Sequence, residues 1–189
     1  MLRQLYFTLF IFSLTTNLNA TIVSNKFDVE EVSKYIKSDN VNAVKDYLSN
    51  FPKKQYYNAQ FQPNKDTIVM IAAKNSSIRV LSYLLALKMN PNLCNKSKTC
   101  PLHIAARKNN ISIVKLLIKN NAQINNQDAE GYTSIMRAIM FKNFDIVDVL
   151  TQHNADLYIK NKDNQTICDI AINIDDPIRI KNFQDKYCK

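Results

Sequence analysis

The sequence lacks residues on which several classes of functional site depend. Among its 189 residues there are one glycine, Gly131, no tryptophan and only two histidines. A phosphate-binding loop needs several closely spaced glycines, and this chain offers no place for one. The abundance of asparagine, isoleucine and lysine instead favours helices joined by asparagine-containing turns, because asparagine tolerates a left-handed backbone better than other non-glycine residues.

Residue sets typical of catalytic or metal sites are also missing. His103 and His153 form no zinc-like spacing with the cysteines, and no Ser/His/Asp or Cys/His arrangement stands out. Asp175 and Asp176 are adjacent carboxylates, but the N-terminus of a helix beginning at Pro177 explains them more simply than acid–base catalysis. We therefore predict no enzymatic activity, no cofactor and no metal site.

The charge of the chain is positive but dispersed. There are 25 basic and 16 acidic residues, a net charge of +9, and the five arginines form no cluster. Nucleic-acid-binding proteins usually concentrate basic residues on one face. The pattern favours a solvated, lysine-rich surface. Electrostatic binding to an anionic membrane or to nucleic acid remains an alternative.

Residues 1–20 have the pattern of a secretory signal peptide. Arg3 precedes an apolar run from Leu5 to Leu14, and a polar stretch then ends at Ala20. A membrane-spanning helix needs about 20 apolar residues, so this run is too short to be one; an uncleaved anchor is the alternative. We expect export to the periplasm or secretion, followed by a flexible linker over residues 21–28.

A repeat of 33 residues organises the rest of the chain. It is visible at threonine-type positions, at small apolar positions and at large ones. These are Thr67, Cys100, Thr133 and Thr166; Ala72, Ala105, Ala138 and Ala171; and Leu84, Leu117 and Leu150. A period of this length indicates a stacked solenoid, in which each unit buries its apolar face against its neighbours.

Each unit has the pattern of two short helices. In the third, Leu102, Ala105 and Ala106 mark one face of the first helix, and Ile113 and Leu117 mark the second. The small alanines should allow neighbouring helices to approach closely.

The motifs resemble those of the ankyrin repeat family. Residues 100–106, CPLHIAA, resemble the TPLHxAA signature, with cysteine at the threonine position. NAQIN at 121–125 resembles the GADVN that closes a unit, and DAEG at 128–131 matches the DxxG turn of a finger. The resemblance implies an all-α solenoid of about five helix-turn-helix units with short β-hairpin fingers. The units are expected at about 29–61, 62–96, 97–127, 128–160 and 161–189.

Three departures from the repeat lead to further expectations. Val41 and Ile78 are 37 residues apart, so a long loop should lie within residues 51–66. Leu81 and Leu93 are twelve residues apart, whereas the corresponding Val114 and Ile124 are ten residues apart. This predicts that the second helix of unit two, or the segment that leaves it, is longer than in the other units. The finger that follows should then be two residues shorter. The last helix should begin after Asp176 and end at about Asp185.

The four cysteines suggest two disulfides. Export permits disulfides, and four cysteines allow three pairings. Cys94 and Cys100 should lie across the base of a finger, and Cys168 and Cys188 at neighbouring ends of antiparallel helices. This favours the pairs 94–100 and 168–188; a buried Cys168 thiol with the other cysteines free is the alternative.

The family resemblance also implies a binding face and a role for His103. The signature histidine makes hydrogen bonds between loops, whereas binding residues lie on the fingers and at exposed positions of the first helices. The implied positions are Lys74, Asn75, Arg107, Lys108, Met140 and Phe141 on the helices, and Ala129, Glu130, Tyr132, Lys162, Asp163 and Gln165 on the fingers.

Two groups of apolar residues are candidates for contact with a partner. Exposed Met140 and Phe141 beside an arginine would have the composition of a binding hot spot; alternatively, Phe141 folds inward against Phe144. Tyr56, Tyr57 and Phe61 on the long loop form a second candidate patch, with packing over unit one as the alternative.

These observations favour an exported, monomeric module that binds another protein, with a host-directed effector as one form. A periplasmic scaffold or immunity protein that masks an enzyme is the alternative.

Overall fold

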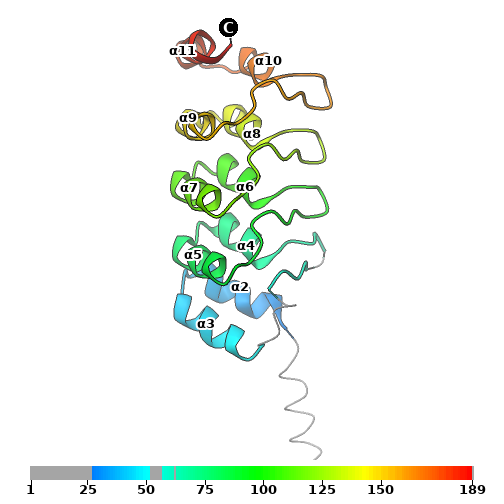
Figure 1. Ribbon diagram of the computed structural model, residues 1–189, viewed down its shortest axis with the longest axis vertical. Coiled ribbons are helices and arrows are strands. Elements are labelled where there is room, and N and C mark those ends of the chain that lie inside the picture. Colours follow the sequence, from blue (N-terminus) through cyan, green and yellow to red (C-terminus); the bar gives the residue numbers. More distant parts are fainter. Residues whose placement is uncertain (1–26, 52–56, 62, 189) are drawn as a thin grey trace, which may run out of the picture.

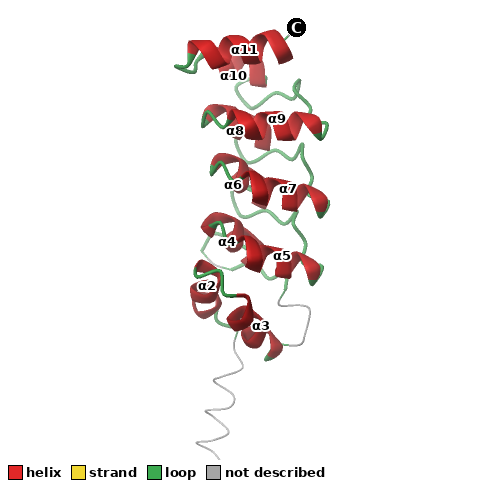
Figure 2. Ribbon diagram, turned by 90° about the vertical axis from the view of Figure 1, so that its left-hand side faces the viewer, coloured by secondary structure: helices red, strands yellow, loops and turns green. Residues whose placement is uncertain are grey.

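The computed structural model of this protein describes residues 27–51, 57–61 and 63–188. The expected signal peptide at 1–20 and most of the expected linker lie outside the described residues. The described part forms a stack of ten α-helices in five pairs, with no strand (Figures 1 and 2). The pairs are α2 Val29–Lys37 with α3 Val41–Ser49, α4 Ile68–Asn75 with α5 Ile78–Ala86, α6 Pro101–Arg107 with α7 Ile111–Lys119, α8 Ser134–Met140 with α9 Phe144–Gln152, and α10 Ile167–Ile172 with α11 Pro177–Tyr187.

The two helices of each pair belong to two parallel columns. The first helices (α2, α4, α6, α8 and α10), here called the inner helices, lie between the projecting fingers and the outer helices (Figure 1). Ala105 and Ala138 on the inner helices are fully buried, as are Ile113 and Leu117 on α7. The stacking predicted from the 33-residue period is therefore confirmed.

Polar caps fix where many of the helices begin. Thr67 Oγ1 accepts a hydrogen bond from the Met70 amide, and Asn110 Oδ1 accepts one from the Ile113 amide. Asp176 caps α11 in the same way, as predicted. Helix α11 continues to Tyr187, two residues beyond the expected end, because Phe183 is buried and the Tyr187 hydroxyl donates to Asp148.

Left-handed backbone recurs three times in each central unit, although only one of these positions is glycine. Equivalent residues with positive φ follow the inner helix, the outer helix and the finger tip. They are Ser76, Asn109 and Lys142; Lys88, Asn121 and Asn154; and Lys65, Lys98, Gly131 and Asn164. Four of them are asparagines, Asn109, Asn121, Asn154 and Asn164, the residue type that tolerates this backbone best after glycine. Lysine and serine carry the strain elsewhere.

The expected irregularity after unit two is wrong. Helix α5 has nine residues, as α7 and α9 do, and the finger that follows is not shorter. Leu93 is not the equivalent of Ile124; Pro91 is, exactly 33 residues earlier. Lys98 (φ 53°) occupies the left-handed position that Gly131 fills in the next finger. The prediction is wrong because this finger makes the same turn without a glycine to mark it.

Residues 27 and 28, which the sequence analysis assigned to a linker, belong to the folded domain. The Phe27 ring stacks on Phe61 at 5.2 Å between centroids and packs edge-on against Tyr47 and Phe51. Asp28 caps α2 by accepting hydrogen bonds from the amides of Glu30 and Glu31.

Candidate protein-binding face

Each of three fingers is closed by one side chain rather than by paired strands. Asn95, Asp128 and Asn161 are spaced by 33 residues, and one side-chain oxygen of each accepts two backbone N–H groups from the following four residues. Two backbone hydrogen bonds complete each turn; in the second finger the Asp128 amide donates to the Tyr132 carbonyl and the Gly131 amide donates to the Asp128 carbonyl, both at 3.0 Å. In the described residues the fingers are therefore tight turns.

Backbone hydrogen bonds join each finger to the next. The amides of Lys96, Ala129 and Lys162 donate to the carbonyls of Asn64, Ser97 and Glu130, at 2.9, 2.9 and 3.1 Å respectively. The fingers therefore keep a fixed spacing along the stack (Figure 1), and the side chains at their tips are held on a rigid framework.

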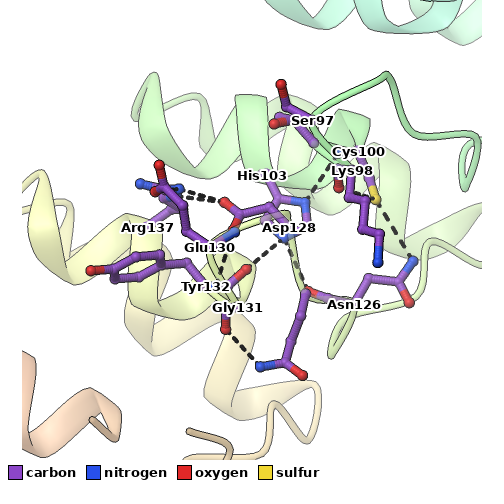
Figure 3. Close-up of polar contacts among 12 residues, drawn as sticks. Ser97, Lys98, Cys100, His103, Asn126, Asp128, Glu130, Gly131, Tyr132 and Arg137 are labelled. Carbon is purple, nitrogen blue, oxygen red and sulfur yellow. Dashed lines mark hydrogen bonds and ion pairs between the residues drawn. The ribbon is translucent and has the colours of Figure 1, made fainter. Parts of the chain in front are cut away.

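His103 links the finger of unit four to its own helix (Figure 3). Its Nδ1 accepts from the Cys100 amide at 3.1 Å, so its proton is on Nε2, which contacts the carbonyls of Asn126 at 3.0 Å and Tyr132 at 3.1 Å. Burial lowers the pKa of His103, although the nearby Asp128 charge opposes this shift. The predicted role in joining loops is what the structure shows.

Arg137 makes a cluster that the sequence analysis missed. Its guanidinium donates to Asp128 Oδ2 at 2.6 and 2.8 Å and to Glu130 Oε2 at 2.7 Å, and it lies 4.3 Å from the centroid of the Tyr132 ring (Figure 3). Arg137 therefore binds both carboxylates and covers a ring predicted to bind a partner. The signal available was an arginine nine residues after the aspartate of the DxxG turn.

The predicted helix positions divide into engaged and free side chains. Lys74 is paired with Asp66, and Asn75 Nδ2 donates to the Ile71 carbonyl at 2.8 Å. Arg107 and Lys108 at the end of α6 are exposed and form no ion pair with any described residue.

Met140 and Phe141 at the end of α8 are exposed by 38% and 51%, so Phe141 does not fold inward against Phe144. Because α6 packs directly against α8, the structure places these two apolar side chains on the unit next to Arg107 and Lys108. Exposed large apolar groups next to free cations are typical of a binding surface.

The predicted finger positions contribute less free surface. Lys162 and Asp163 are exposed, whereas Ala129 and Tyr132 are half-buried. Gln165 Oε1 accepts from Asn161 Nδ2 at 3.1 Å and is occupied within its own finger.

The second candidate patch packs against the core. Tyr57 and Phe61 are partly buried in the first unit, which supports the packing alternative. Tyr56 lies outside the described residues.

Two disulfides join the cysteine pairs that the sequence favoured. Cys94–Cys100 closes the base of the finger at residues 95–99, and Cys168–Cys188 links the start of α10 to the end of α11. The alternative of a buried Cys168 thiol does not describe this structure, in which no cysteine is free.

The described residues offer neither a metal site nor a membrane-spanning helix. No group of three or more His, Cys, Asp or Glu side chains could hold a metal ion there. Likewise, none of the described helices combines the length and apolar character needed to cross a membrane.

Comparison with known proteins places the chain in a family. A family model described as ankyrin repeats (3 copies) matches residues 33–128 and 69–161. Similar proteins include the rat "Ankyrin repeat and SAM domain-containing protein 6" (33% identity over 87 residues, 46% of this chain and 10% of that protein). A "Putative ankyrin repeat protein" of Borreliella burgdorferi is 27% identical over 159 residues, 84% of this chain and 67% of that protein.

The chain spans about a tenth of the rat protein and about two thirds of the Borreliella protein. Ankyrin repeats indicate a protein–protein interaction module and are typically non-catalytic. With the motifs, the helical stack and a family model that covers residues 33–161 in agreement, the chain belongs to the ankyrin repeat family.

Proposed function

We propose that this protein is an exported module that binds another protein through the exposed ends of α6 and α8 and the adjoining fingers. The proposed contact residues are Arg107, Lys108, Met140 and Phe141, together with Lys162 on the finger between α9 and α10. It acts as a monomer and needs no cofactor. Regulation follows from the concentrations of the two partners.

One observation carries this proposal: Phe141 is 51% exposed on a helix end where it could have turned inward. Removing such a ring from water on binding a partner is favourable by roughly 25 cal/mol per Å² of apolar surface. The exposed cations Arg107 and Lys108 on the neighbouring unit add charge at the rim, which affects the rate and specificity of association.

Capture of the partner by the full chain and by two matched double variants tests the proposal. Met140→Ser/Phe141→Ser removes the apolar pair, whereas Ile172→Ser/Ile178→Ser removes exposed apolar side chains of the last unit, 66% and 76% exposed. We expect the first variant to lose the partner and the second to retain it. Equal capture by both folded variants would exclude this face.

Export is supported by the signal-like residues 1–20 and agrees with the two disulfides, which persist in oxidising compartments. A host-directed effector and a periplasmic scaffold or immunity protein share the fold and differ in location. Fractionation of the producing cells separates them. A pool confined to the periplasm would contradict the effector role, and a pool in the culture medium would contradict the scaffold role.

A further inference from the structure

Although the lysines are dispersed along the chain, charge is divided unevenly between the two ends of the stack. Residues 27–127, which contain units one to three, have 15 basic and 6 acidic residues, whereas residues 128–189 have 8 basic and 10 acidic residues. The excess positive charge of the folded domain therefore belongs to its first three units. An anionic partner would be attracted to that end of the molecule.

A groove of about 490 Å³ lies at this end, between α2 and the turn of residues 63–66, here called the first finger. Its apolar lining residues are Val29 on α2, Phe61 just before the first finger and Ile71 on α4. All three are only partly buried against the hydrophobic core. They form an apolar floor that part of a ligand could cover.

Lysines lie along both edges of this groove. Lys34 and Lys37 line it from α2. On the opposite edge, Lys65 follows the lining residue Asn64, whose carbonyl accepts a hydrogen bond from the Lys96 amide at 2.9 Å. All four lysines are exposed, and none forms an ion pair with a described residue. Negative charge on a ligand would therefore be favoured at either edge.

The carboxylates that line the groove do not cancel this charge. Asp66 is already bound by Lys74, and its other oxygen accepts a hydrogen bond from Asn95 Nδ2 at 3.0 Å. Glu30 is exposed and has no ion pair within the described part of the chain. Four unpaired lysines thus accompany one unpaired glutamate, and the groove keeps an excess of positive charge.

We propose that this groove binds an acidic peptide segment of a protein partner, in which one apolar side chain lies between carboxylates. The apolar side chain covers the floor of Val29, Phe61 and Ile71 and leaves water, which supplies the affinity. The carboxylates on its two sides pair with the lysines of the two edges. Exposed ion pairs contribute little individually, so they chiefly speed association and select for charge. This groove is separate from the ends of α6 and α8 and adds a second contact surface to the function proposed above.

The floor of the groove favours a peptide over a nucleic acid. Proteins that hold a single strand stack its bases on aromatic side chains. Phe61 is an aromatic residue of this floor, but one face of its ring is already covered by Phe27, with an interplanar angle of 9°. Val29 and Ile71 are aliphatic and offer no ring for stacking. They can instead contact an apolar side chain of a peptide.

Synthetic peptides containing tryptophan test the groove, because the protein itself has no tryptophan. One heptapeptide carries a tryptophan between two runs of three glutamates, and a second carries glutamines in place of the glutamates. We expect the glutamate peptide to bind the full chain at least about tenfold more tightly than the glutamine peptide. Its emission should shift to the blue as the indole leaves water. Comparable binding of the glutamine peptide, or no binding of the glutamate peptide, would overturn the inference.

Variants matched in charge locate the contact. Lys34→Gln/Lys37→Gln should weaken binding of the glutamate peptide by about three- to tenfold. Lys115→Gln/Lys119→Gln removes the same charge from exposed positions of α7 and should weaken binding by less than about twofold, because salt screens distant charges. Equal losses in the two variants would indicate attraction by net charge alone and would overturn the inference.

The opposite edge and the floor have variants of their own. Lys65→Gln/Lys96→Gln should weaken binding as the α2 variant does. Val29→Thr/Ile71→Thr places hydroxyl groups where the tryptophan should meet apolar carbon, so the blue shift should decrease and binding should weaken by about threefold or more. Urea unfolding checks that this second variant is folded, since both residues lie partly in the core. An unchanged blue shift in the folded variant would contradict the assigned floor.

Further probes separate this groove from the face at the ends of α6 and α8. Met140→Ser/Phe141→Ser should leave binding of the glutamate peptide unchanged. Loss of binding in that variant would assign the peptide to the other face; this would overturn the present inference and leave the proposed function in place. Tighter binding of a deoxythymidine heptamer, or of vesicles rich in phosphatidylserine, than of the glutamate peptide would also overturn the inference, in favour of a nucleic acid or a membrane.

Discussion

At the scale of single residues, His103 combines a structural and a pH-dependent role. Because its Nδ1 accepts from the Cys100 amide while Nε2 faces two carbonyls, protonation of Nδ1 would replace an acceptor by a donor facing another donor. Burial disfavours the charged ring further and lowers the pKa of His103.

We predict that stability falls as the pH drops below about 6.5, the ordinary pKa of histidine in an unfolded chain. In that range the unfolded chain takes up a proton that the folded chain resists, whereas above it both forms are neutral and stability is complete. His103→Gln should lower the free energy of unfolding at pH 8 by about 1–2 kcal/mol and should flatten its pH dependence.

Urea unfolding between pH 8 and pH 5 measures both effects. His153→Gln is the matched control, since His153 is exposed and its ring is hydrogen-bonded to the Val149 carbonyl of the preceding helix. An unchanged pH slope in His103→Gln would contradict the prediction.

The finger tips allow a second prediction from residue-level geometry. A Cβ on Gly131 would lie 2.8 Å from the Lys162 amide nitrogen, which bonds to the Glu130 carbonyl. Gly131→Ala should therefore lower the free energy of unfolding by about 1–3 kcal/mol. Lys98 has a φ of 53°, a strained conformation for lysine that glycine adopts freely. Lys98→Gly should therefore raise the free energy of unfolding by about 0.5–1 kcal/mol.

Denaturant unfolding of both variants tests the opposite signs. Lys115→Gly, in the middle of α7, is the control for a lysine-to-glycine change. Its free energy of unfolding should fall by about 1 kcal/mol because glycine is unfavourable within a helix. If Lys98→Gly also loses stability, the argument from left-handed strain is wrong.

At the scale of elements, α11 depends on a few contacts at its end. Of its eleven residues only Ile180 and Phe183 are buried, and a groove of about 380 Å³ lies between it and α9. Lys186 and Tyr187 bind Asp148 at 2.8 and 2.5 Å, and Cys188 is joined to Cys168. These contacts hold the last outer helix against the stack.

We predict that Cys168→Ser/Cys188→Ser releases α11 without unfolding its neighbours. A disulfide that closes a loop of about this size contributes roughly 3 kcal/mol, so hydrogen exchange in α11 should accelerate about a hundredfold. Exchange in α8 and α9 should not change. Cys94→Ser/Cys100→Ser serves as the control and should leave α11 protected; slow exchange of α11 without its disulfide would refute the prediction.

How far the elements could be predicted from the sequence depended on which residues kept the 33-residue register. Ala72, Ala105 and Ala138 kept it, and this placed the helix pairs; the same register brought the two cysteine pairs together. The finger after unit two was misjudged because Lys98 takes a left-handed turn without the glycine that announces one.

Contacts between units could not be predicted in the same way. Asn143 Nδ2 donates to the carbonyls of Ala106 and Arg107, but its equivalent Asn110 instead caps its own helix. Identical residues at identical register positions make different bonds, depending on the neighbouring unit. For the binding face, the family pattern named Phe141, but only the fold could show that its ring faces outward and that Tyr132 is covered by Arg137.

At the scale of the whole molecule, stability should be graded along the stack. Each unit packs only on its neighbours, so the central units have two partners and the outer ones have one. We predict that amides of α6 and α8 exchange most slowly, and those of α2, α3 and α11 fastest. Hydrogen exchange followed by mass spectrometry checks this order; uniform protection along the chain would indicate a single cooperative unit instead.

The two disulfides have a mechanical consequence for the stack. Each bridge closes a short stretch of chain, with sequence separations of 6 and 20, and neither spans the molecule. Tension applied at the two ends would therefore peel the units apart in sequence. The bridge between Cys168 and Cys188 would withhold roughly 70 Å of contour length from extension, at about 3.5 Å per residue, until a reductant cut it.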